Sequence, residues 1–162
     1  MNKAGSREKQ FQDLISLVDS EILKGKIDFG HNSNVYVSVD ESIEFEDKIF
    51  LIEIDASNMA KLVAGQFTLL NLLKNKQNKN SINRINCACE KELIFLVVHC
   101  YGQGSKVYNP QRSLKNFKFI AESCFPEGLR FGSVHMDELI TKIPQLTHRD
   151  ELEEYLETII YN

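Results

Sequence analysis

Residues 35–66 form the stretch that decides the fold, and they run VYVSVDESIEFEDKIFLIEIDASNMAKLVAGQ. Polar and apolar residues alternate over 42–46, as they do in strands that bury one face, and the apolar-rich run 49–55, which ends in the alternating Glu53, Ile54 and Asp55, is predicted to be the next strand. Asp47 and Lys48 stand between these runs and are predicted to form a two-residue turn. We therefore expect an antiparallel hairpin.

The turn sets the register of this hairpin. A turn at Asp47 and Lys48 places Asp40 opposite Asp55, with Glu53 on the same face one step away. The opposite face is then uniformly apolar, with Ile43, Phe45, Phe50, Ile52 and Ile54. A slip of one residue would split that apolar face, so the pattern supports the register.

The rest of the chain is predicted to form one α/β domain over residues 1–162, with a mixed central sheet flanked by helices. The run LIFLVV at 93–98 is typical of a central strand buried on both faces. Ser57 or Asn58 is expected to cap the helix after the hairpin, and Thr147 with Asp150 resembles a capping box. Periodicity predicts helices at 6–24, 59–73, 111–125 and 150–160, strands at 35–39 and 129–134, and a loop at 26–34.

The composition is that of an ordinary globular protein, with 162 residues, 43% hydrophobic and 26% charged. Since no apolar run is long enough to span a membrane and the N-terminus has no apolar signal region, we expect a cytoplasmic protein without a membrane partner. Four scattered cysteines are expected to be reduced thiols: Cys87, Cys89, Cys100 and Cys124.

Charge is strongly segregated along the chain. Residues 40–55 hold seven acids and one lysine, whereas 56–118 hold ten bases and two acids. A polyanion bound beside a cation site would explain both segments. The alternative is that these are unrelated solvated faces.

The acidic cluster needs a chemical explanation, because Asp40, Glu53 and Asp55 repel one another on one face. A divalent cation would neutralise them, and Mg²⁺ typically takes one or two carboxylates and keeps waters for a phosphate and a nucleophile. A nearby lysine could position or deprotonate that water. We therefore expect Mg²⁺ or Mn²⁺ at these three residues and metal-dependent hydrolysis of a phosphodiester. The alternative is a solvated polar face without an ion.

Asp40, then Glu53-Ile54-Asp55 at a strand end, then a helix, resembles the PD-(D/E)XK nucleases, the restriction-endonuclease-like superfamily. In that family an Asp opens the second strand, an acid-x-Lys closes the third, and a helix follows. The resemblance covers residues 35–66. It implies an αβββαβ core and a metal-dependent endonuclease, for which we expect DNA as the substrate ahead of RNA. It also implies that Asp40 and Glu53 are the two acids and that Gln66 matches a glutamine found in some branches.

Two positions depart from the family pattern. Val39 stands where proline is frequent, which is a minor difference. Asp55 stands where the family has lysine, so the cation that activates water is missing from its usual place. Lys61, near the start of the following helix, is the candidate for a relocated catalytic lysine. Without such a replacement the site would be inactive.

Basic residues downstream of the acids are expected to bind the phosphate backbone of nucleic acid, with Tyr108 stacking on a base. The expected contacts are Lys74, Lys76, Lys79, Arg84, Lys106, Arg112 and Lys115. Three aromatic residues nearby are expected in the core: Phe117, Phe119 and Phe125. The alternative is a solvated loop and helix face.

Two functions of different classes fit these patterns. One is a Mg²⁺-dependent nuclease, which by analogy with compact nucleases could be a homodimer. The other is an inactive module on the same fold that binds nucleic acid or a protein partner. Carboxylates of 40, 53 and 55 that converge near Lys61 would favour the enzyme, and splayed carboxylates the binding module.

A third and weaker alternative is a hydrolase that uses cysteine and histidine. The spacing of Cys87, Cys89, His99 and Cys100 matches no usual zinc motif. His99 and Cys100 are adjacent on a predicted strand and so point to opposite faces.

Overall fold

The computed structural model describes residues 5–31, 35–56, 59–74, 91–101 and 110–161. Its elements, in chain order, are α1 (Ser6–Ser16), β1 (Ile27–His31), β2 (Val35–Val39), β3 (Glu41–Glu44), β4 (Lys48–Asp55), α2 (Ala60–Leu73), β5 (Glu92–His99), α3 (Pro110–Cys124), β6 (Arg130–His135), α4 (Met136–Lys142), the 3-10 turn η1 (Ile143–Gln145) and α5 (Arg149–Ile159).

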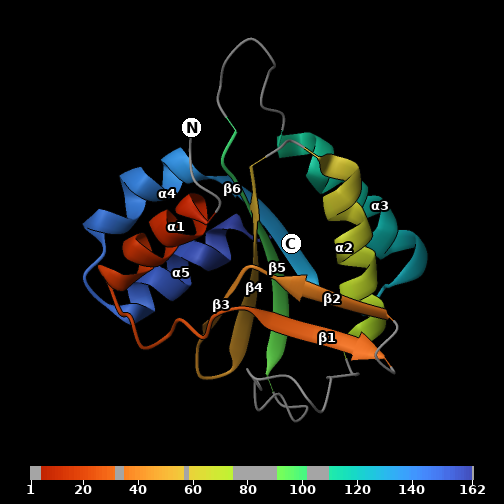
Figure 1. Ribbon diagram of the computed structural model, residues 1–162, viewed down its shortest axis with the longest axis horizontal. Helices are drawn as coiled ribbons and strands as arrows, with labels where there is room; N and C mark the ends of the chain where they lie inside the picture. The colour runs from red at the N-terminus through yellow and green to blue at the C-terminus, as the bar shows by residue number, and fades with distance from the viewer. Residues whose placement is uncertain (1–4, 32–34, 57–58, 75–90, 102–109, 162) are drawn as a thin grey trace.

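A four-stranded mixed sheet in the order β3-β4-β5-β6 lies at the centre. β3 pairs antiparallel with β4, while β5 and β6 run parallel to it. Figure 1 shows α1, α4 and α5 on one side of this sheet and α2 and α3 on the other. The expected α/β class is confirmed. Across the described ranges, none of the helices has the length and apolarity that crossing a membrane requires.

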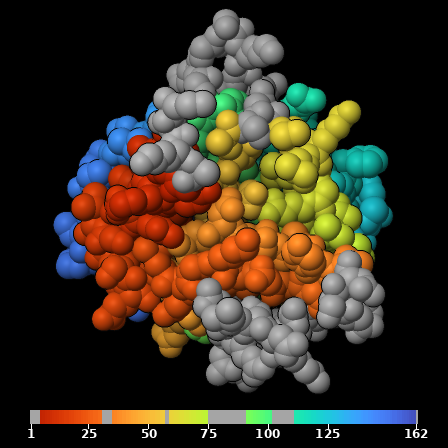
Figure 2. Space-filling view, in the orientation of Figure 1, coloured from red at the N-terminus to blue at the C-terminus, as the bar shows by residue number. Residues whose placement is uncertain are grey.

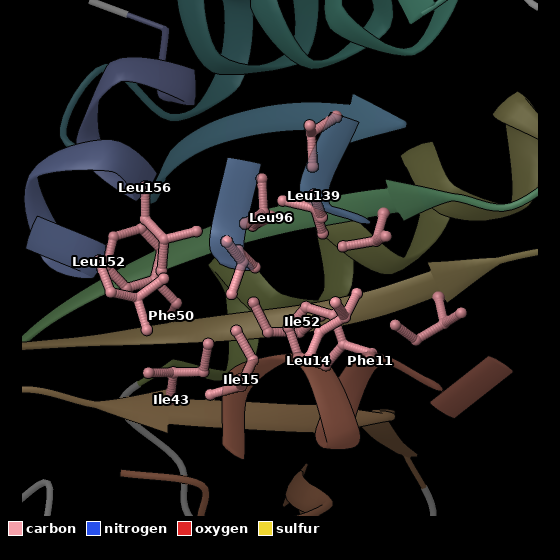
Figure 3. Close-up of a cluster of buried hydrophobic side chains, with 14 of the residues drawn as sticks. Phe11, Leu14, Ile15, Ile43, Phe50, Ile52, Leu96, Leu139, Leu152 and Leu156 are labelled. Atoms are coloured by element: carbon pink, nitrogen blue, oxygen red, sulfur yellow. The ribbon is translucent and has the colours of Figure 1, made fainter. Parts of the chain in front are cut away.

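The first core lies between the sheet and α1, α4 and α5. Figure 3 shows Ile52 of β4 near Phe11 and Leu14 of α1, and Phe50 of β4 near Leu152 and Leu156 of α5, all of them buried. Every residue of the predicted apolar hairpin face belongs to this core: Ile43, Phe45, Phe50, Ile52 and Ile54. The two faces of the hairpin were therefore predicted correctly from strand alternation.

The second core lies between the sheet and α2 and α3. Aromatic rings dominate it. The ring centroid of Phe67 in α2 lies 5.0 Å from that of Phe117 in α3 and 5.8 Å from that of Phe95 in β5. Ring pairs at these separations stabilise a core beyond their buried area. The antiparallel pair β1-β2 adds Phe29 and neighbouring apolar residues to this core.

The predicted register of the hairpin was wrong by two residues. Phe45 N donates to Lys48 O at 2.9 Å, so the turn is centred on Glu46 and Asp47, one residue before the predicted turn. The reason is tertiary, because the Lys48 ammonium lies 2.8 Å from Glu153 of α5 and is thereby held in β4. A shift of two residues preserves the faces. The β3-β4 ladder ends at the pair Glu41 and Ile52, so Asp40 does not face Asp55; it lies beside Glu53, hydrogen-bonded to Ile52 O and Ile54 N on either side of that residue.

Other boundaries also differ from the predictions. The predicted loop at 26–34 contains β1, whose alternating Ile27 and Phe29 are buried. α1 ends at Ser16 and not at 24. Met59 takes the N-cap position of α2, and the predicted caps Ser57 and Asn58 lie outside the described residues. The capping box of α5 is formed by His148 and Glu151, and not by Thr147 and Asp150.

Candidate functional site

The candidate site lies where the parallel strands end. Asp55, His99 and His135 close β4, β5 and β6 and are neighbours in register. Helices α2, α3 and α4 begin just after this edge, at the upper end of the sheet in Figure 1. Ligands of open α/β sheets bind outside the carboxyl ends of the strands. In Figure 2 the part of the chain around β4, coloured gold, reaches the surface between α1 in red and α2 in yellow-green.

Asp40 and Glu53 are brought together across the β3-β4 pair. Asp40 follows β2, and its backbone N donates to Ile52 O at 3.0 Å. Its Oδ2 accepts a hydrogen bond from Ile54 N at 2.9 Å, which holds the carboxylate beside the neighbouring residue Glu53. Both acidic side chains are half-buried.

Gln66 of α2 orients Glu53. Its Nε2 donates to Glu53 Oε2 at 2.6 Å and to Ser38 O at 2.8 Å. The amide therefore links the helix, the end of β2 and the carboxyl on β4.

Ionisation of both carboxyls in this pair is unfavourable. The pKa of Glu53 is raised to about 7, first by burial and then by the charges of Asp40 and Asp55, while the Gln66 hydrogen bond opposes the shift. The pKa of Asp40 is raised as well, by burial first and by the charge of Glu8, against the hydrogen bond from Ile54. A cation between the two carboxyls would relieve this cost.

Sequence reasoning missed Lys26, which stands just before β1. The charge of its exposed side chain lowers the pKa of both Asp40 and Glu53, against the larger effect of burial. The predicted loop at 26–34 hid this residue. Alternation of Ile27 and Phe29 with Asp28 and Gly30 was the signal that could have identified a strand there.

Asp55 shares the face of Glu53 but is directed elsewhere. Its Oδ2 lies 3.1 Å from His99 Nδ1, and both side chains are buried. Within the described part of the chain, no three His, Cys, Asp or Glu side chains form a set of metal ligands. The expected convergence of three carboxylates is therefore not found, and the pair that faces together is Asp40 and Glu53.

His135 has a structural task at the same edge. Its Nδ1 accepts from Asp137 N at 3.2 Å and caps α4, so its Nε2 carries the hydrogen and donates to Tyr101 O at 2.9 Å. This pairing holds the chain after β5 against the start of α4.

In the described part of the chain, the predicted catalytic lysine and the basic residues predicted to contact nucleic acid are spread over both ends of α2 and over α3. Lys61 lies in the first turn of α2 with an exposed side chain. Lys74 lies at the far end of α2, where its ammonium donates to Glu127 O at 2.8 Å. Arg112 and Lys115 are exposed on α3. Burial raises the pKa of Tyr101, and the charge of Arg112 opposes this shift. Several predicted residues lie outside the described ranges: Lys76, Lys79, Arg84, Cys87, Cys89, Lys106 and Tyr108.

The aromatic predictions near α3 were partly wrong. Phe117 is fully buried, as expected, and Phe125 is half-buried. Phe119 is 71% exposed and lies on the helix surface next to Lys118 in sequence. An exposed ring beside basic residues is a feature of surfaces that bind single-stranded nucleic acid.

A scan against protein-family models, a search of curated proteins and a search of solved structures find no match to this chain. The resemblance to PD-(D/E)XK nucleases therefore rests on the motif alone.

Proposed function

We propose that this protein is a divalent-metal-dependent phosphodiesterase that acts on nucleic acid and prefers DNA to RNA as its substrate. The observation that carries the proposal is the half-buried pair Asp40 and Glu53, in which Asp40, just before β3, is hydrogen-bonded to the residues on either side of Glu53 in β4. Two acids in such a position are costly without a cation, and perturbed carboxyls of this kind cluster at functional sites.

The donor chemistry of the pair fits Mg²⁺ or Mn²⁺. Both side chains offer carboxylate oxygens, and Mg²⁺ is commonly held in proteins by one or two carboxylates together with waters and substrate phosphate. When bound, such an ion polarises a phosphodiester and lowers the pKa of a water. Asp40 and Glu53 would hold it, with Gln66 and Ile54 N fixing the two carboxylates.

The reaction is a hydrolysis. The oxygen of a water forms a bond to phosphorus, and the bond from phosphorus to one sugar oxygen breaks with its electron pair on that oxygen. The water loses a proton to solvent, and the leaving oxygen takes one up. Arg112 and Lys115, exposed on α3, are available to bind neighbouring phosphates of the same strand.

The test is cleavage of plasmid DNA, of a single-stranded DNA oligonucleotide and of RNA, each with Mg²⁺, with Mn²⁺ and with EDTA. Asp40→Asn and Glu53→Gln should each lower the rate at least about 100-fold. Asp47→Asn is the matched control, because Asp47 lies in the turn of the same hairpin with 75% of its side chain exposed. Undiminished cleavage by Asp40→Asn or Glu53→Gln would refute the proposal.

A second candidate is an inactive module that binds nucleic acid or a protein partner. The observation that favours it is Asp55, which stands in place of the family's lysine and contacts His99. This function predicts that the protein binds DNA but cleaves none of the substrates with either metal. An active wild-type protein would exclude it.

A further inference from the structure

Lys26 is held opposite Asp40 by backbone pairing on both sides. After Lys26, Ile27 pairs with Val39 in the β1-β2 ladder. Before it, Leu23 forms a bridge with Ile43, and Lys24 N donates to Ser42 O at 3.0 Å. Both contacts have the same antiparallel register, so Lys26 and Asp40 are the partners between them.

The segment that carries Lys26 is also locked by a buried acid. Glu41, 1% exposed, accepts from Gly25 N at 2.5 Å and from Gln12 Nε2 of α1 at 2.7 Å. Ser42 Oγ donates to Gly25 O at 2.8 Å. Gly25 has φ 79, a left-handed backbone that glycine adopts without strain. The backbone next to Lys26 is therefore fixed relative to β3.

The two sets of contacts then combine. The register on both sides places Lys26 opposite Asp40, and Asp40 is hydrogen-bonded to the residues before and after Glu53, so one cation and two acids lie on three adjacent segments of chain. The charge of Lys26 acts on both carboxyls, lowering the pKa of each against the effect of burial. Its side chain is exposed, so a substrate arriving from solvent can meet it.

We infer that Lys26, and not Lys61, is the catalytic cation of this site, contacting the non-bridging oxygens of the reacting phosphate beside Asp40 and Glu53. This inference rests on the proposed function. Lys26 keeps its proton throughout; its ammonium stabilises the negative charge that builds up on those oxygens as water attacks. A lysine supplied by the segment before β1 would compensate for the acid at position 55.

The experiment compares four variants of the full chain: Lys26→Met, Lys26→Arg, Lys61→Met, and Lys142→Met as an exposed control on α4. Cleavage rate at saturating DNA, Mn²⁺ affinity by calorimetry, and thermal unfolding are measured for each. The inference predicts that Lys26→Met cleaves about 100-fold more slowly and at least tenfold more slowly than Lys61→Met. Mn²⁺ should bind Lys26→Met as tightly as the wild type or more tightly, because a repelling charge is gone. Lys26→Arg should recover part of the rate.

The outcomes separate the inference from the proposed function. Wild-type cleavage that survives in Lys26→Met, or that is lost only in Lys61→Met, overturns the role of Lys26 and leaves the proposed function standing. Loss of cleavage together with loss of Mn²⁺ binding or of the folded state in both Lys26 variants also overturns it, because that pattern is structural. A wild-type protein that cleaves nothing refutes the proposed function itself, and the catalytic role with it.

Discussion

Glu53 combines burial, a neighbouring acid and a donated hydrogen bond in one side chain. Its pKa of about 7 follows first from burial and then from the charges of Asp40 and Asp55. A carboxyl that is costly to ionise lowers the stability of the folded protein at neutral pH, as is common at sites shaped for function. The cost is removable by a proton or by a cation.

The stability of the protein should therefore depend on pH through Glu53. The folded pKa lies above the ordinary value of 4.5, so the folded state holds this proton more tightly than the unfolded state does. Stability from this group is present below about pH 4.5 and is lost as the pH rises through about 7. The loss is about 3–4 kcal/mol, at roughly 1.4 kcal/mol for each unit by which the pKa is raised.

Urea unfolding of the wild type and Glu53→Gln at pH 5 and pH 8 measures this loss. Other acids titrate in both proteins, so the difference between the proteins isolates Glu53. Glu53→Gln should gain stability relative to the wild type at pH 8 and not at pH 5. An identical pH dependence in the two proteins would show that Glu53 ionises normally.

Gln66 should act as a positioning residue. Gln66→Ala removes the donors to Glu53 Oε2 and Ser38 O, so we expect Mn²⁺ affinity to fall about tenfold, the loss of a hydrogen bond to a charged group. Thr68→Ala is the control, because Thr68 Oγ1 donates only to Ala64 O within α2. Calorimetry with Mn²⁺ tests this, and equal affinity in both variants would contradict the role of Gln66.

The faces of the β3-β4 hairpin were predictable from sequence, because alternation is a local signal. The register was not, because the turn residues allowed either Asp47-Lys48 or Glu46-Asp47. The choice depends on Glu153 of α5, about a hundred residues away in sequence, which pairs with Lys48. Local patterns cannot supply a contact of that kind.

The candidate site was predictable to a similar extent. Asp40 and Glu53 share a face by strand period alone. The pairing of Asp55 with His99 depends on the parallel register of β4 and β5, which no local pattern encodes. Lys26 was missed because Gly25 comes shortly before a short strand and Gly30 lies within it, which made the segment resemble a loop.

Two glycines in regular elements should respond to alanine in opposite ways. A Cβ at Gly132 of β6 would lie 2.6 Å from Ile159 O, where the end of α5 crosses the strand. Gly132→Ala should destabilise the protein by about 1–3 kcal/mol. At Gly65 in α2 a Cβ meets no described atom within 4 Å, so Gly65→Ala should stabilise it by about 0.5–1 kcal/mol.

Thermal unfolding of the two variants checks this pair directly. A higher melting temperature for Gly132→Ala would contradict the close packing of α5 on β6. A lower one for Gly65→Ala would contradict the open surface described for that turn of α2.

At the scale of the whole molecule, the acidic site lies near a helix that carries exposed basic residues. The two acids of the site lie just before β3 and near the carboxyl end of β4, and the exposed basic residues of α3 begin beside that edge of the sheet. A strand of nucleic acid could follow α3 from Arg112 past Lys115 to Phe119. The net charge of −4 hides this local arrangement.

Lys115→Ala should weaken DNA binding for all sequences alike and reduce the slope of log affinity against log salt by about 1. Lys142→Ala, on the opposite side of the sheet, should change neither quantity. Fluorescence anisotropy with a labelled oligonucleotide at several salt concentrations measures both. Equal slopes in the wild type and Lys115→Ala would place the nucleic acid elsewhere.

The most direct test of the site is an anomalous difference map from crystals soaked in Mn²⁺. We predict a peak between the carboxylates of Asp40 and Glu53, with oxygen ligands at about 2.0–2.2 Å, near the Mg²⁺ value. The same soak of Asp40→Asn crystals should show no peak there. A wild-type map with no peak at this pair, or with its strongest peak elsewhere, would contradict the assignment of Asp40 and Glu53 as a metal site.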